Sequence, residues 1–402
     1  MAKAAQAARQ TVIPFVGAAH AYRRKYNTQT PQLGTSNVDV SPPGNEIFSS
    51  GFLRAHCTKV GTKTAASSGG TLSGDGVFGL IHTVQYRQPG GQLMHGGPNF
   101  GGFLEYLANK QSGWKYCNDP ALLPSFSGAT TTTSPSFVIR AIFELNAQTG
   151  LGSLPNQNDA AAWQLQMDTA TVAAAYTTAP TTTNPTLTFD HFVECWTVPS
   201  PQNPLRPSVR QITQPPLLGT LNKWTVQQRV VAGGATQDVD LVRKGNSLRN
   251  LGIICCLSSG GVGADLRGAV SNIPNPLTVQ WDDTVIRAND DPNLWIDDEY
   301  MIRGGAAQTT PETTDTGVIF LKNGDPGGLD LSALGLDGLG MTKQWGTTTT
   351  STITWGGSWG ANVNLVKFLT NDVQYVIPKA NPYALSSGQP YLTNATQPSA
   401  LT

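Results

Sequence analysis

Hydrophobic and polar residues alternate along most of the chain with the period of two that is typical of β-strands. Leu53, Ala55 and Cys57 fall on one face of a predicted strand, and the residues between them fall on the other. The same pattern predicts strands in a first stretch at residues 53–58, 78–86, 137–145 and 187–198. A second stretch has predicted strands at residues 223–231, 248–257, 277–286, 318–321, 349–355, 363–369 and 373–377. The chain is therefore predicted to be mainly β-sheet.

Each stretch also contains one short predicted helix between its strands. In residues 99–110, four apolar residues recur at positions i, i+3, i+4 and i+7, which is the spacing of one helix face. In the second stretch, Asp291 and Pro292 suit the start of a helix that runs to about residue 302. Because the two stretches place their elements in a similar order, we predict two β-sandwiches in tandem.

Proline-rich and polar segments divide the chain into five predicted parts. Residues 1–36 form a basic N-terminal arm, residues 37–198 a first sandwich, and residues 199–216 a linker with six prolines. Residues 217–385 form the second sandwich, and residues 386–402 a C-terminal tail. The Ala- and Thr-rich residues 156–185 are expected to form a long loop outside the first sandwich.

The N-terminal arm combines positive charge with helical spacing. Residues 1–38 contain no acidic residue, and their basic residues are Lys3, Arg9, Arg23, Arg24 and Lys25. Apolar residues recur every three or four positions from residue 5 to residue 26, which predicts an amphipathic helix that Pro14 kinks or divides. The arm is interpreted as a segment that lies on a membrane surface or reaches a neighbouring molecule. A frayed, Ala-rich tail is the alternative.

The composition favours a protein whose surface is largely covered by neighbouring molecules. The 402-residue chain has 13% charged residues, half the usual quarter, and 26 basic residues balance 26 acidic ones. Such a surface does not attract a polyanion, so direct nucleic-acid binding is not expected. A secreted, lectin-like sandwich fits the same numbers. No run of residues is long and apolar enough to span a membrane, and no signal peptide is expected.

No pattern in the chain predicts catalysis, a metal or a cofactor. Residues 356–360 match the G-x-S-x-G pattern around Ser358, but the histidine must follow the serine in that fold, and the last histidine is His191. Residues 335–342 resemble a phosphate-binding loop but have Met341 where the lysine should be. The five cysteines are too scattered for a disulfide framework or a zinc site, and we expect them to be buried. One acidic cluster lacks the alternating ladder of a calcium loop and suits a helix N-terminus: Asp282, Asp283, Asp290, Asp291, Asp297, Asp298 and Glu299.

Four segments of the first stretch together resemble a known family. They are GFLR at residues 51–54, the strand at residues 80–87, the PGG turn at residues 89–91, and FGGFLEYLANK at residues 100–110. They resemble the major capsid proteins of tectiviruses, which are icosahedral bacteriophages with an internal membrane. A strand ending in an aromatic residue, a tight turn and an aromatic-bearing helix recur in that family, and Tyr86 stands in the first of these places. The insertion at residues 147–185 and the glycine-rich residues 327–340 depart from it, so the tower loops and trimer contacts stay unassigned.

This resemblance implies an all-β fold of two tandem eight-stranded jelly rolls, a double jelly roll, with short helices and an N-terminal helical arm. It implies a structural protein without catalytic activity, cofactor or metal. Three copies would form a pseudo-hexagonal trimer, and the trimers would tile an icosahedral shell. Penton proteins, minor capsid or membrane proteins and the inner membrane would be its partners. The protein would be made in the host cytoplasm and end in the virion, with its basic arm at the membrane or a neighbour.

A carbohydrate- or receptor-binding β-sandwich, such as a virion spike or a lectin, is the competing interpretation. The chain has nine tryptophans, and four of them gather late in the sequence, at Trp295, Trp345, Trp355 and Trp359. Exposed indole rings can serve as platforms for sugar rings. Tryptophans are more often core or interface residues, so the structural interpretation is preferred.

Overall fold

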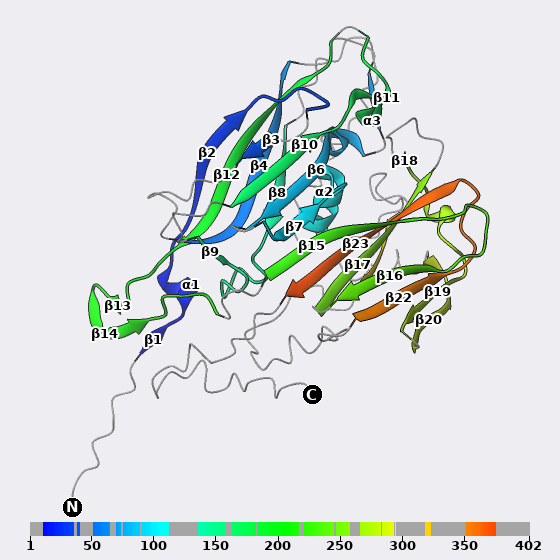
Figure 1. The fold of residues 1–402 in the computed structure, drawn as a ribbon. Coiled ribbons are helices and arrows are strands. Elements are labelled where there is room, and N and C mark those ends of the chain that lie inside the picture. The colour runs from blue at the N-terminus through cyan, green and yellow to red at the C-terminus, as the bar shows by residue number, and fades with distance from the viewer. Residues whose placement is uncertain are drawn as a thin grey trace, which may run out of the picture.

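The structure is a computed structural model of the chain (Figure 1). It describes residues 11–35, 38–40, 51–64, 70–73, 75–88, 91–111, 136–156, 163–181, 183–216, 221–244, 247–257, 266–282, 284–292, 294, 318–322 and 350–374. The predicted helix after Asp291, the C-terminal tail and residues 327–340 lie almost wholly outside these ranges.

Two antiparallel sheets form the first sandwich. One sheet has the order β3 (Val38–Val40), β10 (Gln164–Thr169), β6 (Ile81–Arg87) and β7 (Leu93–Gly97). The other has the order β2 (Ala21–Gln29), β12 (Thr186–Thr197), β4 (Gly51–Thr64) and β8 (Phe137–Ile142), with β9 (Leu154–Asn156) also paired to β4. Smaller elements connect them, namely α2 (Gly102–Gln111), α3 (Val172–Ala175), a 3₁₀ helix (Gly76–Leu80), and the paired β5 (Thr71–Leu72) and β11 (Tyr176–Thr178).

The second sandwich repeats this arrangement. Its first sheet has the order β15 (Leu221–Val230), β23 (Val363–Gln374), β17 (Ser247–Leu257) and β18 (Leu266–Arg267), with β21 (Val318–Lys322) also paired to β17. Its other sheet has the order β16 (Val239–Lys244), β22 (Thr350–Gly356), β19 (Leu277–Trp281) and β20 (Thr284–Asp290). A 3₁₀ helix (Val270–Asn272) precedes β19.

Corresponding strands occupy corresponding places in the two sandwiches. The last strand, β12 or β23, lies between the opening strand, β2 or β15, and a third long strand, β4 or β17. In the facing sheets, β10 lies between β3 and β6 as β22 lies between β16 and β19. Two sandwiches that share one order of their long strands are a double jelly roll, which confirms the predicted fold class.

Alternating apolar side chains fill the space between the sheets of each sandwich. Phe189 and Val193 of β12 and Tyr86 of β6 belong to one core cluster in the first sandwich, and all three are buried. Trp355 of β22 packs near Phe368 of β23 in the second core, with ring centroids 5.8 Å apart. Strands with one buried and one polar face are stable only when their apolar faces meet, and this explains the period of two in the sequence.

The N-terminal segment differs from the predicted amphipathic helix. Only α1 (Phe15–Ala18) is helical in its described part, and residues 21–29 form β2, the edge strand that pairs with β12. Tyr22 and Tyr26 pack against the first core. A spacing of four residues places side chains on one face of a strand as well as of a helix, so this spacing did not distinguish the two.

Residues 156–185 also differ from their prediction as an external loop. They contain β10, which lies inside a sheet between β3 and β6. Leu165 and Met167 of this strand are each only 1% exposed. The alternation of Gln164 to Asp168 is that of an ordinary strand, but it is short and flanked by Ala- and Thr-rich sequence.

Two further boundaries differ from the sequence prediction. The strand predicted at residues 277–286 is a hairpin of β19 and β20, which turns at Asp282 with a positive φ of 46°. The start of the strand predicted at residues 78–86 is a 3₁₀ helix that ends at Leu80. The helix predicted at residues 99–110 is confirmed as α2.

Candidate functional site

Ser358, the serine of the G-x-S-x-G match, contacts Thr236 at the surface of the second jelly roll. Its hydroxyl oxygen lies 3.0 Å from the hydroxyl oxygen of Thr236, at a backbone bridge between these two exposed residues. Within the described ranges, no three His, Cys, Asp or Glu side chains converge on a point that could hold a metal ion. Four cysteines, Cys57, Cys195, Cys255 and Cys256, are buried free thiols as predicted, and Cys117 lies outside the described residues.

Replacing Ser358 with alanine should leave the melting temperature, assembly and any background ester hydrolysis unchanged. The substitution removes one exposed hydrogen bond to Thr236, which contributes at most about 1 kcal/mol. Calorimetry and a chromogenic ester assay on both proteins check this. Loss of a measurable esterase activity in the variant would contradict the structural interpretation.

Two of the four tryptophans proposed as sugar platforms, Trp355 and Trp359, lie inside the second jelly roll. Trp355 and Trp359 are 0% and 1% exposed, and the Trp359 Nε1–H donates to the Gln237 carbonyl oxygen at 2.9 Å. Trp295 and Trp345 lie outside the described residues. The two described rings are core residues and offer no surface to a sugar.

The predicted arm residues that the structure describes lie on strand β2. Arg23 Nε donates to Glu194 Oε1 at 2.7 Å, and Lys25 Nζ lies 2.6 Å from Asp190 Oδ1. The hydrogen bond from Lys25 lowers the pKa of Asp190 below its ordinary value. Arg24 pairs through its backbone with Val193 of β12, while Lys3 and Arg9 lie outside the described residues. The charges of Arg23 and Lys25 are therefore directed at carboxylates of their own jelly roll.

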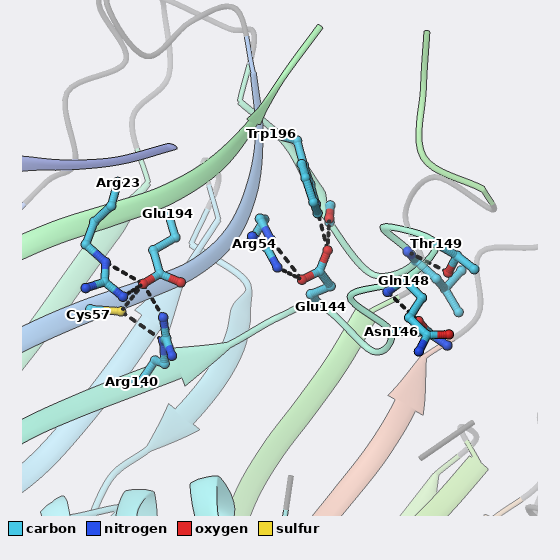
Figure 2. Close-up of polar contacts among 12 residues, drawn as sticks. Arg23, Arg54, Cys57, Arg140, Glu144, Asn146, Gln148, Thr149, Glu194 and Trp196 are labelled. Atoms are coloured by element: carbon cyan, nitrogen blue, oxygen red, sulfur yellow. Dashed lines mark hydrogen bonds and ion pairs between the residues drawn. The ribbon is translucent and has the colours of Figure 1, made fainter. Parts of the chain in front are cut away.

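Glu194 stands at the centre of the first charged cluster (Figure 2). Arg23 of β2 and Arg140 of β8 both bind its Oε1 atom, and the Arg140 side chain is only 7% exposed. The Cys57 thiol lies 3.4 Å from the same oxygen and 3.2 Å from Arg140 Nε. Burial raises the pKa of Glu194, but Arg140 and Arg23 outweigh this effect, so the pKa lies below its ordinary value. Burial raises the pKa of Cys57 to about 12, so this thiol stays protonated.

Glu144 anchors a second cluster on the same sheet (Figure 2). Arg54 Nε and Nη2 both bind its Oε2 atom, at 2.9 and 2.8 Å. Trp196 Nε1 donates to the Oε1 atom at 2.7 Å, and Ser153 Oγ lies 3.3 Å from it. The Arg54 guanidinium also lies over the Trp196 ring, 4.1 Å from the centroid. Burial raises the pKa of Glu144 despite these donors.

The contacts described for these two clusters hold strands of the first jelly roll together. Each carboxylate already binds two or more donors from other strands or loops of the first jelly roll. Strand alternation alone did not predict these clusters, because it assigns charged residues within the strands to outward-facing positions. Arg54, Arg140 and Glu194 at the middle of apolar strands were the available signal, since such residues are rarely buried unless they are paired.

Known structures support the fold through similarity of structure, whereas comparisons of sequence give no match. No protein-family model matches the chain, and no curated protein matches it by sequence. The PBCV-1 virus capsid structure matches with a TM-score of 0.57 and 12% identity, over 88% of this chain and 94% of that chain. The STIV MCP matches with a TM-score of 0.53 and 15% identity, over 91% and 100%. A structure of Sulfolobus Turreted Icosahedral Virus matches with a TM-score of 0.54 and 10% identity, over 88% and 91%.

These observations place the chain in the double jelly-roll fold class. The resemblance suggested by the sequence is confirmed for the fold. The likeness covers both jelly rolls, because it extends over nearly the whole of this chain and of each matched chain. At 10–15% identity it establishes the fold alone. Within the described ranges, no helix combines the length and the apolar character needed to cross a bilayer.

Proposed function

We propose that this protein is the major capsid protein of an icosahedral virus. The observation that carries the proposal is the full-length match to capsid structures of two viruses, which spans both jelly rolls and leaves little of the chain for another domain. The low charge content supports it, because weakly charged surfaces suit extensive contact with neighbours. The buried Trp355 and Trp359 count against the lectin-like alternative.

Three copies form the unit of assembly in this proposal. Two similar jelly rolls in one chain give a three-fold trimer six similar domains, so that its outline approaches a hexagon. Such trimers tile a shell, and penton and minor capsid proteins complete it. The protein would therefore be found in the virion and would need no catalytic activity.

Sedimentation velocity at micromolar protein concentration tests this proposal. We expect a trimer or larger assemblies, because obligate interfaces commonly bury more than about 2,000 Å² in total. A folded monomer that binds glycans saturably would contradict the capsid proposal and favour the lectin-like alternative.

Lys3 and Arg9 are the main arm residues that we propose to contact an internal membrane. Arg23 and Lys25 are paired with carboxylates. Each basic residue near an anionic bilayer contributes about 1 kcal/mol. We expect full-length protein to pellet with phosphatidylserine-containing vesicles, and the Lys3→Glu/Arg9→Glu variant to pellet several-fold less. Neutral phosphatidylcholine vesicles are the control. Equal pelleting of the two proteins with anionic vesicles would refute the membrane role of these residues.

A further inference from the structure

The linker between the jelly rolls forms a small projecting sheet. β13 (Gln202–Asn203) and β14 (Arg206–Gln211) form a hairpin, and β1 (Val12–Ile13) pairs in parallel with β14. We call these three strands the wing. Figure 1 shows the wing extending from the end of the first jelly roll, beside α1. The linker predicted from its prolines is thus an ordered element rather than a simple connection.

The base of the wing is fixed to the body by aromatic packing. Phe15, which follows β1, is buried and lies 5.3 Å from Phe52 and 6.1 Å from Trp196 between ring centroids. Ile212, which follows β14, packs against the same cluster. The wing is therefore held in one orientation before it meets any partner, which lowers the entropy cost of binding.

The tip of the wing is apolar and its flank is basic. Leu205, in the turn of the hairpin, is 91% exposed, more than the other exposed large hydrophobic residues of the described ranges. Arg206 and Arg210 lie on β14, and no acidic residue occurs between residues 195 and 237. Such a short ribbon contributes little core, so the exposed Leu205 and Arg206 and the half-buried Arg210 can meet a partner.

The second jelly roll carries exposed carboxylates along strand β16, which also contains Arg243 and Lys244. One of these carboxylates, that of Asp240, already accepts a hydrogen bond from Thr354 Oγ1 at 2.7 Å. The outer face of the β16–β22–β19–β20 sheet carries exposed Asp238 and Asp240, and Asp282 lies exposed at the β19–β20 turn. Asp240 stands opposite Thr354, and exposed Val242 stands opposite Thr352 in the strand register. Arg229 reaches only the edge of this sheet, where its Nε donates to the Asp240 carbonyl oxygen. The face thus offers carboxylates beside an apolar contact point.

These two surfaces cannot meet within one molecule. In Figure 1 the wing lies at the lower left, beside the end of the first jelly roll, and the β16–β22–β19–β20 sheet lies well away from it at the lower right. A contact between two different surfaces of identical molecules is heterologous, and such contacts close into rings or extend as arrays. A second copy of this chain is therefore a partner with the required complementarity.

We infer that the wing of one copy docks on the outer face of the β16–β22–β19–β20 sheet of a neighbouring copy, with Arg206 and Arg210 facing Asp238 and Asp240. This inference rests on the proposed function, since it requires that copies assemble. It adds to that function by naming the two surfaces that form one contact between copies. Because charges at or near the surface carry the contact, it should weaken as the salt concentration rises.

A charge-swap experiment by sedimentation velocity at 0.15 M NaCl tests this contact. The Arg206→Glu/Arg210→Glu variant should lose at least ten-fold in assembly affinity, and Asp238→Lys/Asp240→Lys should behave alike. Combining all four substitutions in one chain should restore most of the affinity, because the complementarity returns with opposite signs. Lys59→Glu/Lys63→Glu, on exposed residues of β4, is the control with the same charge change and should assemble normally.

The outcomes distinguish failure of the inferred contact from failure of the proposed function. If wild-type protein stays monomeric, the proposed function fails and the contact fails with it. If wild type assembles and the Arg206→Glu/Arg210→Glu variant assembles equally well, only the inferred contact is overturned. Failure of the four-fold variant to recover, or an equal loss in the control, would also overturn it. So would normal assembly combined with loss of binding to phosphatidylserine vesicles, because the wing would then be a membrane contact.

Discussion

Replacing Glu194 with alanine is expected to lower the free energy of unfolding by about 3–5 kcal/mol, because it leaves the buried Arg140 guanidinium without its carboxylate. The pair joins β8 to β12 across β4, and Arg23 adds β2 to the same oxygen. The loss should therefore fall on the first jelly roll. Urea unfolding followed by circular dichroism measures the change.

Asp190→Ala is the matched control for this substitution. Asp190 lies on the same strand and also binds a basic residue of β2, but its partner Lys25 is 47% exposed. Exposed ion pairs contribute about 0–1 kcal/mol, so the control should be nearly neutral. Equal losses in the two variants would show that burial of Arg140 is not the cause of the effect.

Acidification from pH 7.5 to pH 5 is expected to destabilise the first jelly roll through two buried histidines. His56 and His191 lie with ring centroids 5.7 Å apart, and Tyr86 packs against His56. The Tyr26 hydroxyl lies 2.7 Å from His56 Nε2, and Thr58 Oγ1 lies 2.9 Å from His191 Nδ1. Burial lowers the pKa of His191 to about 4 and that of His56 well below its ordinary value, with His191 adding to the effect.

The sign of this effect follows from proton binding. The unfolded chain binds protons on these histidines near pH 6.5, while the folded protein does not, so stability is full above this pH and falls below it. His191 alone should cost about 2 kcal/mol at pH 5. His191 Nε2 is buried without a hydrogen-bond partner among the described residues, so a proton there would also lack an acceptor.

Comparing His191→Asn with wild type isolates this contribution. Burial raises the pKa of Glu144, which favours the folded state on acidification, but this carboxyl is present in both proteins and cancels in the comparison. The variant should lose less stability between pH 7.5 and pH 5 than wild type does. His82→Asn, at an exposed histidine, is the control and should keep the wild-type slope. Identical slopes in all three proteins would contradict the assignment to His191.

The sequence was sufficient to predict those parts of the fold that local periodicity encodes. Strand alternation around Leu53 and Phe189, and the helical stripe from Phe100 to Leu107, correspond to β4, β12 and α2. Strand β2 was mistaken for a helix because a four-residue spacing suits both structures. Strand β10 was missed because its alternation is short, and its place in the sheet depends on partners distant in sequence.

The charged clusters and the wing depend on tertiary contacts that no local pattern specifies. Glu194 and Arg140 are 54 residues apart, and β1 reaches β14 across nearly 200 residues. A proline-rich segment is usually a simple connection, so nothing in residues 199–216 pointed to a partner strand near the N-terminus. The basic residues of β2 were predicted to contact a membrane or a neighbouring molecule, because the carboxylates that bind Arg23 and Lys25 lie on a strand distant in sequence.

Electron microscopy of the purified, negatively stained protein tests the capsid proposal most directly. We expect particles with three-fold symmetry and a near-hexagonal outline, or closed shells built from them, because each chain supplies two jelly rolls with the same strand order. A uniform field of single, two-domain particles at micromolar concentration would contradict the proposal.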